Sequence, residues 1–233
     1  MGLFDKKFCD ICGGKIGLLG NRKLEDGNMC KDCASLLSPF TTDRRKTSLS
    51  EIKDHLAYRD DNKTQVEMFN ATRSLGGKTK VLLDEDAAKF IVTSSSHWQN
   101  ENPDVVNFSQ VIGCQTDIRE SRTEIKFKNK DGTDTSFVPP RYDIDYDFYI
   151  TIQVNSPWFN EMSFKINNNS ISQSNAVEYR ETERIANEIR EALTEVRESA
   201  STSRKVQTCP MCGATTTPDV RGCCEFCGGV LPK

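Results

Sequence analysis

The sequence predicts an α+β protein with a strand-rich middle part and a small cysteine-rich module near each end. Three observations lead to this prediction. C-x-x-C pairs occur near both ends of the 233-residue chain. Between them, hydrophobicity alternates with a period of two from about residue 80 to 166, as in half-buried strands. A stretch with helical periodicity, residues 176–200, then follows and should cap the sheet.

The N-terminal module contains two pairs, Cys9/Cys12 and Cys30/Cys33, with seventeen residues between them. Zinc takes four ligands tetrahedrally, and thiolate is a preferred donor in structural sites. Gly13 can adopt positive φ, which lets backbone N–H groups approach the sulfurs. The second pair should open a short helix, whose N-terminal amides stabilise thiolate charge. We therefore predict a closed four-cysteine zinc site.

The C-terminal module repeats the pattern with Cys209, Cys212, Cys224 and Cys227. Both pairs are of the C-x-x-C-G knuckle type found in zinc ribbons and rubredoxin. Eleven residues separate the pairs, which leaves almost no core, so the fold of this ribbon must depend on its metal. Cys223 could replace Cys224, but the two-residue gap to Cys227 favours Cys224. The prediction is two Zn²⁺ per chain.

Disulfide bonds and redox-active thiols are the alternatives. Residues 1–7 lack the apolar core of a secretory signal, which argues against an oxidising compartment. No βαβ pattern surrounds either pair, which argues against a redox motif. No apolar run reaches membrane-spanning length. We expect a cytoplasmic protein without a membrane span.

The middle of the chain divides into a helical connector and a β domain. Ser48 and Glu51 form a predicted capping box, and Asp60-Asp61-Asn62 should interrupt the helix that follows. Asn129-Lys130-Asp131-Gly132 contains the Asp-Gly signal of a hairpin turn. The seven predicted strands are 80–84, 89–94, 108–118, 123–128, 133–138, 142–154 and 162–166.

The clearest strand is 142–154, whose even positions are all apolar or aromatic. Such alternation is typical of an antiparallel sheet with one face on a core. Seven antiparallel strands capped by a helix is the element order of pleckstrin-homology-like domains, which this part resembles in that order alone. A generic small β-barrel or sandwich with a packed helix is the alternative. Cys114, within a strand, should be a buried thiol.

These elements give five predicted segments. They are an N-terminal zinc-ribbon or treble-clef-like module at 1–47, a helical connector at 48–79, a capped β domain at 80–200, a flexible linker at 201–208 and a zinc ribbon at 209–233. The linker prediction rests on a run of Ser and Thr.

The N-terminal module resembles a known family. The motifs are Phe8-Cys9-Asp10-Ile11-Cys12-Gly13-Gly14, the run from Gly20 to Gly27, and Cys30-Lys31-Asp32-Cys33. Across about residues 8–60 they resemble a bacterial family of unknown function whose N-terminal module is described as a zinc ribbon. The resemblance implies zinc ligation by the four cysteines and implies no activity. The cysteine spacing also equals that of GATA-type fingers, but the residues those fingers use on DNA have no counterparts here.

Charge is unevenly distributed along the chain. The formal net charge is −3, and residues 1–80 carry 15 Lys and Arg against 11 Asp and Glu. Only this weakly basic segment, with Arg44-Arg45-Lys46, favours a polyanion. Asp143, Asp145 and Asp147 share one strand face and should form a solvated acidic surface, because alternate residues lie about 7 Å apart.

The histidines give little support for catalysis. His55 falls in a polar helix and should face solvent, and His97 precedes Trp98 in a loop. No nucleophile accompanies either of them. The sequence therefore favours a non-enzymatic, zinc-binding adaptor with a protein partner. A nucleic-acid-binding zinc-finger protein is the alternative, and an enzyme with a pocket beside His97 and Trp98 ranks third.

Overall fold

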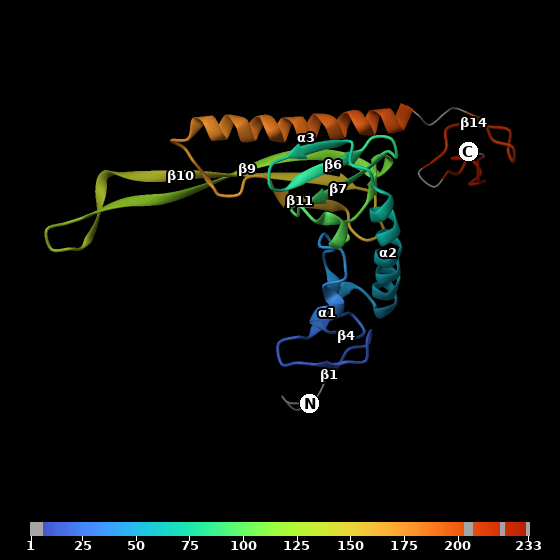
Figure 1. Ribbon diagram of the computed structural model, residues 1–233, viewed down its shortest axis with the longest axis horizontal. Helices are drawn as coiled ribbons and strands as arrows, with labels where there is room; N and C mark the ends of the chain where they lie inside the picture. The colour runs from blue at the N-terminus through green and yellow to red at the C-terminus, as the bar shows by residue number, and fades with distance from the viewer. Residues whose placement is uncertain (1–6, 203–206, 220–221, 232–233) are drawn as a thin grey trace.

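The computed structural model describes residues 7–202, 207–219 and 222–231 (Figure 1). Two antiparallel sheets form the body of the molecule. The first has the strand order β5-β6-β7-β8. Its strands are Arg73–Gly76, Lys80–Asp84, Lys89–Thr93 and Val106–Asn107. The short helices η2, Trp98–Asn100, and η3, Phe108–Gln110, flank β8.

The second sheet is built on one long strand, β10, Asp134–Val154. One edge of β10 pairs with β9, Val111–Lys128, and the other edge pairs with β11, Glu161–Lys165, and β12, Ile171–Ser172. Helix α3, Ala176–Thr202, packs on this sheet (Figure 1). The predicted α+β class and the long helix on a sheet are confirmed.

Both sheets and α3 contribute to one hydrophobic core. Alternation along β10 buries Phe148, Ile150, Ile152 and Val154, while the residues between them remain partly exposed. The first sheet adds Leu75, Val81, Leu83, Phe90 and Val92, and α3 adds Ala186, Ile189, Ala192 and Leu193. The helix therefore completes the core between the sheets.

The prediction of seven strands was wrong in how it divided the sheet. The predicted strands 108–118 and 123–128 are one strand, β9, and 133–138 and 142–154 are one strand, β10. Residues 119–122 are polar and exposed, but they continue β9 because a strand exposed on both faces needs no apolar alternation. The body has eight strands, because β5, β8 and β12 escaped prediction.

Beyond the core, β9 and β10 continue as a two-stranded ribbon, residues 119–144, which we call the arm. Figure 1 shows it projecting past the N-terminal end of α3. The predicted turn is present, since Asn129 N donates to Thr133 O over 2.9 Å and Gly132 has φ +77°. The alternation of β10 continues into the arm without a core to cover it, so Tyr142 is 49% exposed.

Helix α2, Leu49–Met68, connects the N-terminal module to the body (Figure 1). The predicted capping box is confirmed, because Ser48 and Glu51 exchange hydrogen bonds. The predicted interruption at 60–62 was wrong. Asn62 is buried within a continuous helix, and its amide nitrogen donates to the side-chain oxygen of Asn102 over 2.7 Å. That partner, forty residues away, satisfies the polar group inside the fold.

Of the predicted linker, 201–202 belong to α3, 207–208 form a strand, and 203–206 lie outside the described residues. None of the described helices has the length and apolarity required to cross a membrane.

Candidate metal centres

The N-terminal cysteines are carried by two small hairpins and a helix. Strands β1, Lys7–Phe8, and β2, Lys15–Ile16, flank the turn with Cys9 and Cys12. Strands β3, Arg22–Lys23, and β4, Asn28–Met29, lead into α1, Lys31–Ala34. Cys30 is the N-cap of α1 and Cys33 lies within it, as predicted.

Hydrogen bonds hold this turn against the second hairpin. The Asp10 carboxylate accepts from Asn28 N over 2.6 Å, and Asp10 N donates to Asn28 O over 2.8 Å. Cys9 Sγ accepts from Cys30 N over 3.2 Å, and Cys30 Sγ accepts from Cys33 N over 3.3 Å. The amides at the start of α1 therefore point at sulfur, which favours thiolate.

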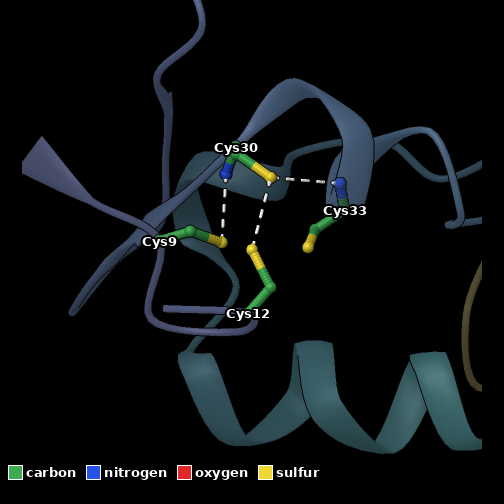
Figure 2. A group of neighbouring side chains, drawn as sticks. All are labelled: Cys9, Cys12, Cys30 and Cys33. Atoms are coloured by element: carbon green, nitrogen blue, oxygen red, sulfur yellow. Dashed lines mark hydrogen bonds between the residues drawn. The ribbon is translucent and has the colours of Figure 1, made fainter. Parts of the chain in front are cut away.

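The four sulfurs converge on one point, as Figure 2 shows. All lie within 4.8 Å of one another, and Cys12 Sγ and Cys30 Sγ are 3.8 Å apart. Four sulfurs bound tetrahedrally to zinc at about 2.3 Å lie about 3.8 Å from each other. This donor set can hold a metal ion of that size.

The C-terminal cysteines form a second cluster of the same kind. Strands β13, Gln207–Thr208, and β14, Thr215–Thr216, flank Cys209 and Cys212. The sulfurs of Cys209 and Cys227 are 3.6 Å apart, and those of Cys212 and Cys224 are 3.7 Å apart. All four lie within 4.8 Å of one another, so this cluster could also hold a metal ion.

Three of the four C-x-x-C turns have the same backbone. In each, the first cysteine N donates to the carbonyl five residues on, and the glycine after the second cysteine donates back to the first cysteine O, over 2.8 to 2.9 Å. The glycines are Gly13, Gly213 and Gly228, with φ between +71° and +72°. This left-handed conformation explains the glycine that follows each of these pairs.

Cysteine pKa values within the N-terminal cluster diverge. Burial raises the pKa of Cys9, but the N–H groups of Cys12, Cys30 and Ile11 outweigh burial and lower it to about 6. The pKa of Cys33 lies well above its usual range because of burial and the neighbouring thiols. Negative charge on one sulfur thus opposes ionisation of the next. A dication at the centre would relieve this repulsion.

The same divergence appears in the C-terminal cluster. The N–H of Cys212 lowers the pKa of Cys209 to about 7. The N–H of Gly229 lowers the pKa of Cys227, but the thiols of Cys212 and Cys209 outweigh it and raise this pKa to about 12.

The remaining cysteines lie outside both clusters. Cys224, the predicted ligand, is buried in the C-terminal cluster, whereas the adjacent Cys223 forms a β-bridge with Val230. Cys114 is partly rather than fully buried, and burial raises its pKa to about 11. The predicted grouping of eight cysteines thus matches the structural grouping.

A buried polar network connects the N-terminal module to the body, and we call it the joint. Its members are Ser38, His55, Tyr58, Arg59, Asn62, Asn102, Asp104 and Trp158. The Asp104 carboxylate accepts from Arg59 Nη1 and from the Ser38 hydroxyl, each over 2.7 Å. Both charged side chains are almost inaccessible to solvent. The joint therefore fixes the middle of α2 to the loop before β8.

His55 belongs to the joint, so the prediction that it faces solvent was wrong. It is 2% exposed, and its Nε2 accepts from Ser38 N over 3.3 Å. Its ring stacks on Trp158 with centroids 5.0 Å apart. The sequence held no local signal for this burial, because Trp158 lies a hundred residues further on.

The other candidates are not assembled into a site. His97 is exposed, and Trp98 packs on Phe69. Asp147 pairs with Lys165 over 2.6 Å, whereas neither Asp143 nor Asp145 joins a metal-capable cluster. Among the described residues, only the two cysteine clusters bring three or more potential ligands together. A cleft of about 290 Å³ lies between α2 and the body beside Tyr58 and Trp158, away from His97.

A family model described as a domain of unknown function, DUF4428, matches residues 7–55. This range includes all four cysteines of the N-terminal cluster and ends within α2. No curated protein and no solved structure matches the chain.

Proposed function

We propose that this protein is a zinc-binding, non-enzymatic adaptor that works in the cytoplasm and binds a protein partner through its metal modules. Each cysteine cluster holds one Zn²⁺, with four protein ligands and no vacant position for substrate. Three matching knuckles, sulfur spacings of 3.6 to 3.8 Å and N–H groups directed at sulfur support zinc. The bound ions shape modules too small to fold through a core.

The observation that carries the adaptor proposal is exposed apolar surface on both modules. Leu18 and Leu19, in the loop after β2, are 90% and 88% exposed. In the C-terminal module, Met211 and Phe226 occupy the middle of the two knuckles and are 74% and 71% exposed. Aromatic residues and Met are enriched in protein interfaces. Clustered apolar side chains at a surface mark interaction sites.

Capture of partners by matched variants tests this proposal. Wild type, Leu18→Ser/Leu19→Ser and Met211→Ser/Phe226→Ser are compared as bait in extracts of the native cell, after each is shown to contain two zinc ions. Met68→Ser is the control, because Met68 is 63% exposed at the end of α2. Wild type and the control should retain proteins that a module variant loses. The same set of proteins on all four baits would contradict the proposal.

The middle domain is proposed to be pleckstrin-homology-like and to act as the scaffold between the modules. Two antiparallel sheets around a common core, followed by a long helix packed on one of them, support this assignment. The long arm, in which β9 and β10 continue beyond the core, is not part of the seven-stranded arrangement predicted from the sequence.

Nucleic-acid binding is a second candidate, supported by a basic cluster on the N-terminal module. Arg22 and Arg45 lie close enough to Arg44 to lower its pKa, after the larger effect of burial. Within the described chain, Arg44 Nε has no hydrogen-bond partner although the atom is buried. An anion bound beside these guanidinium groups would relieve the repulsion among them.

A gel-shift titration with mixed-sequence duplex DNA at low salt tests this candidate. Binding should weaken steeply as salt rises and should fall in Arg44→Ala/Arg45→Ala. Lys53→Glu on α2 is the control for a change in net charge. Absence of a shift at low salt removes the candidate.

A further inference from the structure

We propose that two copies of this chain pair through their arms, with the outer edges of the two β9 strands joined antiparallel about a twofold axis at Thr123. The proposal is independent of the metal modules. It rests on the open edge of β9, on the solvation of the arm and on the order of charges along β9.

The outer edge of β9 has no partner strand in the described chain. β9 is hydrogen-bonded to β10 alone, over nearly its whole length. Near its start, Ile112 O accepts from Arg197 of α3 over 2.6 Å. Figure 1 shows that α3 ends before the arm does, so the distal half of β9 projects free of it. Its backbone N–H and C=O groups are available to another strand.

A lone two-stranded ribbon is also a poor structure by itself. An isolated hairpin in water is at best marginally stable, and three or more strands are needed for independent stability. Within the arm, the rings of Phe127 and Phe137 pack in a tilted arrangement with centroids 4.9 Å apart, and no residue of 119–144 is fully buried. Joining two arms edge to edge makes a four-stranded sheet and about ten new backbone hydrogen bonds over residues 118–128.

The charges on one face of β9 are complementary to themselves. Glu120, Arg122, Glu124 and Lys126 occupy alternate positions and so share a face, with the signs minus, plus, minus, plus. When the strand meets its own copy antiparallel about Thr123, Glu120 faces Lys126 and Arg122 faces Glu124. Symmetry repeats both pairs, giving four pairs of opposite charge. Such cross-strand pairs stabilise a sheet.

The same charges select this register over its neighbours. A shift of the axis to Arg122 places Arg122 opposite itself and Glu120 opposite Glu124. A shift to Glu124 places Glu124 opposite itself and Arg122 opposite Lys126. A shift of the axis by one residue in either direction therefore opposes like charges. A shift by two residues, to Ser121, keeps only the two Glu120–Arg122 pairs and loses the other half of the opposite-charge pairs. On the other face of β9, this register places Arg119, whose guanidinium lies over the Tyr149 ring in the separate chain, opposite Phe127 of the other copy.

The occupant favoured by these observations is a second copy, because the charge order fits its own reverse. In the separate chain, Arg122 pairs with Glu120 of its own strand. In the proposed dimer, Arg122 lies between that partner and Glu124 of the other copy, so the existing pair is extended rather than broken.

Charge reversal and its rescue test the proposal on the full, zinc-loaded chain by sedimentation velocity. Wild type should be dimeric. Glu120→Lys or Lys126→Glu alone puts like charges opposite each other twice, so each should weaken dimerisation about tenfold. The double variant Glu120→Lys/Lys126→Glu restores every opposite pair and should restore the dimer. Mixing the two single variants should likewise give a heterodimer, since their charges are complementary.

Lys53→Glu, an exposed reversal on α2, is the control and should leave the dimer unchanged. The rescue separates a lost interface from a misfolded arm, because a folding defect is not cured by a second reversal. A wild-type chain that stays monomeric overturns the proposal, as does a dimer that single reversals do not weaken or that the double reversal does not restore. A monomer that takes an unrelated extended peptide on β9 would also overturn it.

Discussion

Each C-x-x-C-G knuckle depends on one residue that is not a ligand. The glycine after the second cysteine has φ near +71° and donates its N–H to the first cysteine carbonyl. Any other L-residue adopts this conformation at a cost of about 1–2 kcal/mol. The knuckle is therefore shaped by a local backbone requirement that the sequence displays directly, and prediction succeeded there.

Replacing Gly13 by Ala should weaken zinc binding at the N-terminal site about tenfold, because the strained backbone costs free energy in the bound form. Competition with a chromogenic chelator measures the change. Gly17→Ala is the control, since Gly17 lacks positive φ and a Cβ there meets no atom within 4 Å. Equal affinities for the two variants would show that the left-handed turn is unimportant.

His55 makes stability depend on pH. Burial, aided by the charge of Arg59, lowers the pKa of His55 from 6.5 to about 4. As pH falls through this window the unfolded chain takes up a proton that the folded chain does not, so stability present above pH 6.5 is lost. Between pH 6.5 and about 4, the free energy of unfolding should therefore fall by about 1 kcal/mol more per pH unit in wild type than in His55→Gln.

Denaturant unfolding followed by tryptophan fluorescence measures both slopes. The comparison cancels loss of metal at low pH, because both proteins keep all eight cysteines. Parallel slopes for wild type and His55→Gln would show that His55 titrates normally in the folded protein.

At the scale of elements, α2 is held by the joint more than by an apolar stripe. Arg59 donates to Asp104 over 2.7 Å and to Leu36 O over 3.2 Å, which joins the helix to both the module and the body. A buried ion pair adds little stability over apolar residues, but loss of one partner leaves a buried charge. The joint therefore fixes the position of α2 relative to the module and the body. Loss of one of its two charged partners should strongly destabilise the fold.

Asp104→Ala should lower the free energy of unfolding by about 3–5 kcal/mol, because Arg59 is left buried and unpaired. Arg59→Met/Asp104→Ala removes both charges and should recover part of that loss. Asp60→Ala on the same helix is the control, since Asp60 and Lys63 form an ion pair in open solvent, where such pairs add little stability. Urea denaturation measures all three, and equal losses for Asp60→Ala and Asp104→Ala would contradict this role.

Sequence predicted the elements whose determinants are local. The Ser48 capping box, the hairpin turn before Thr133 and the core half of β10 all carry short-range signals. The joint could not be predicted, because Asn62 and His55 are buried by partners 40 and more residues away. The arm could not be predicted either, because the apolar alternation of β10 extends into the arm, where no hydrophobic core lies against it.

At the scale of the whole molecule, the two metal modules lie at separate ends of the molecule (Figure 1). The N-terminal module packs beside the first half of α2, whose Ile52 joins its core, and the C-terminal module lies beyond the C-terminal end of α3. Each cluster is formed by cysteines from its own module alone. The two sites should therefore fill and empty independently, and loss of one module should leave the core between the sheets intact.

Metal analysis of the purified chain tests the central claim, that each cysteine foursome holds one zinc ion. Wild type, Cys114→Ser and Cys223→Ser should each contain two zinc ions per chain, whereas Cys9→Ser and Cys209→Ser should each contain one. X-ray absorption should show four sulfur neighbours at about 2.3 Å. A wild-type chain with fewer than two bound metal ions, or unchanged zinc in Cys9→Ser and Cys209→Ser, would contradict the account.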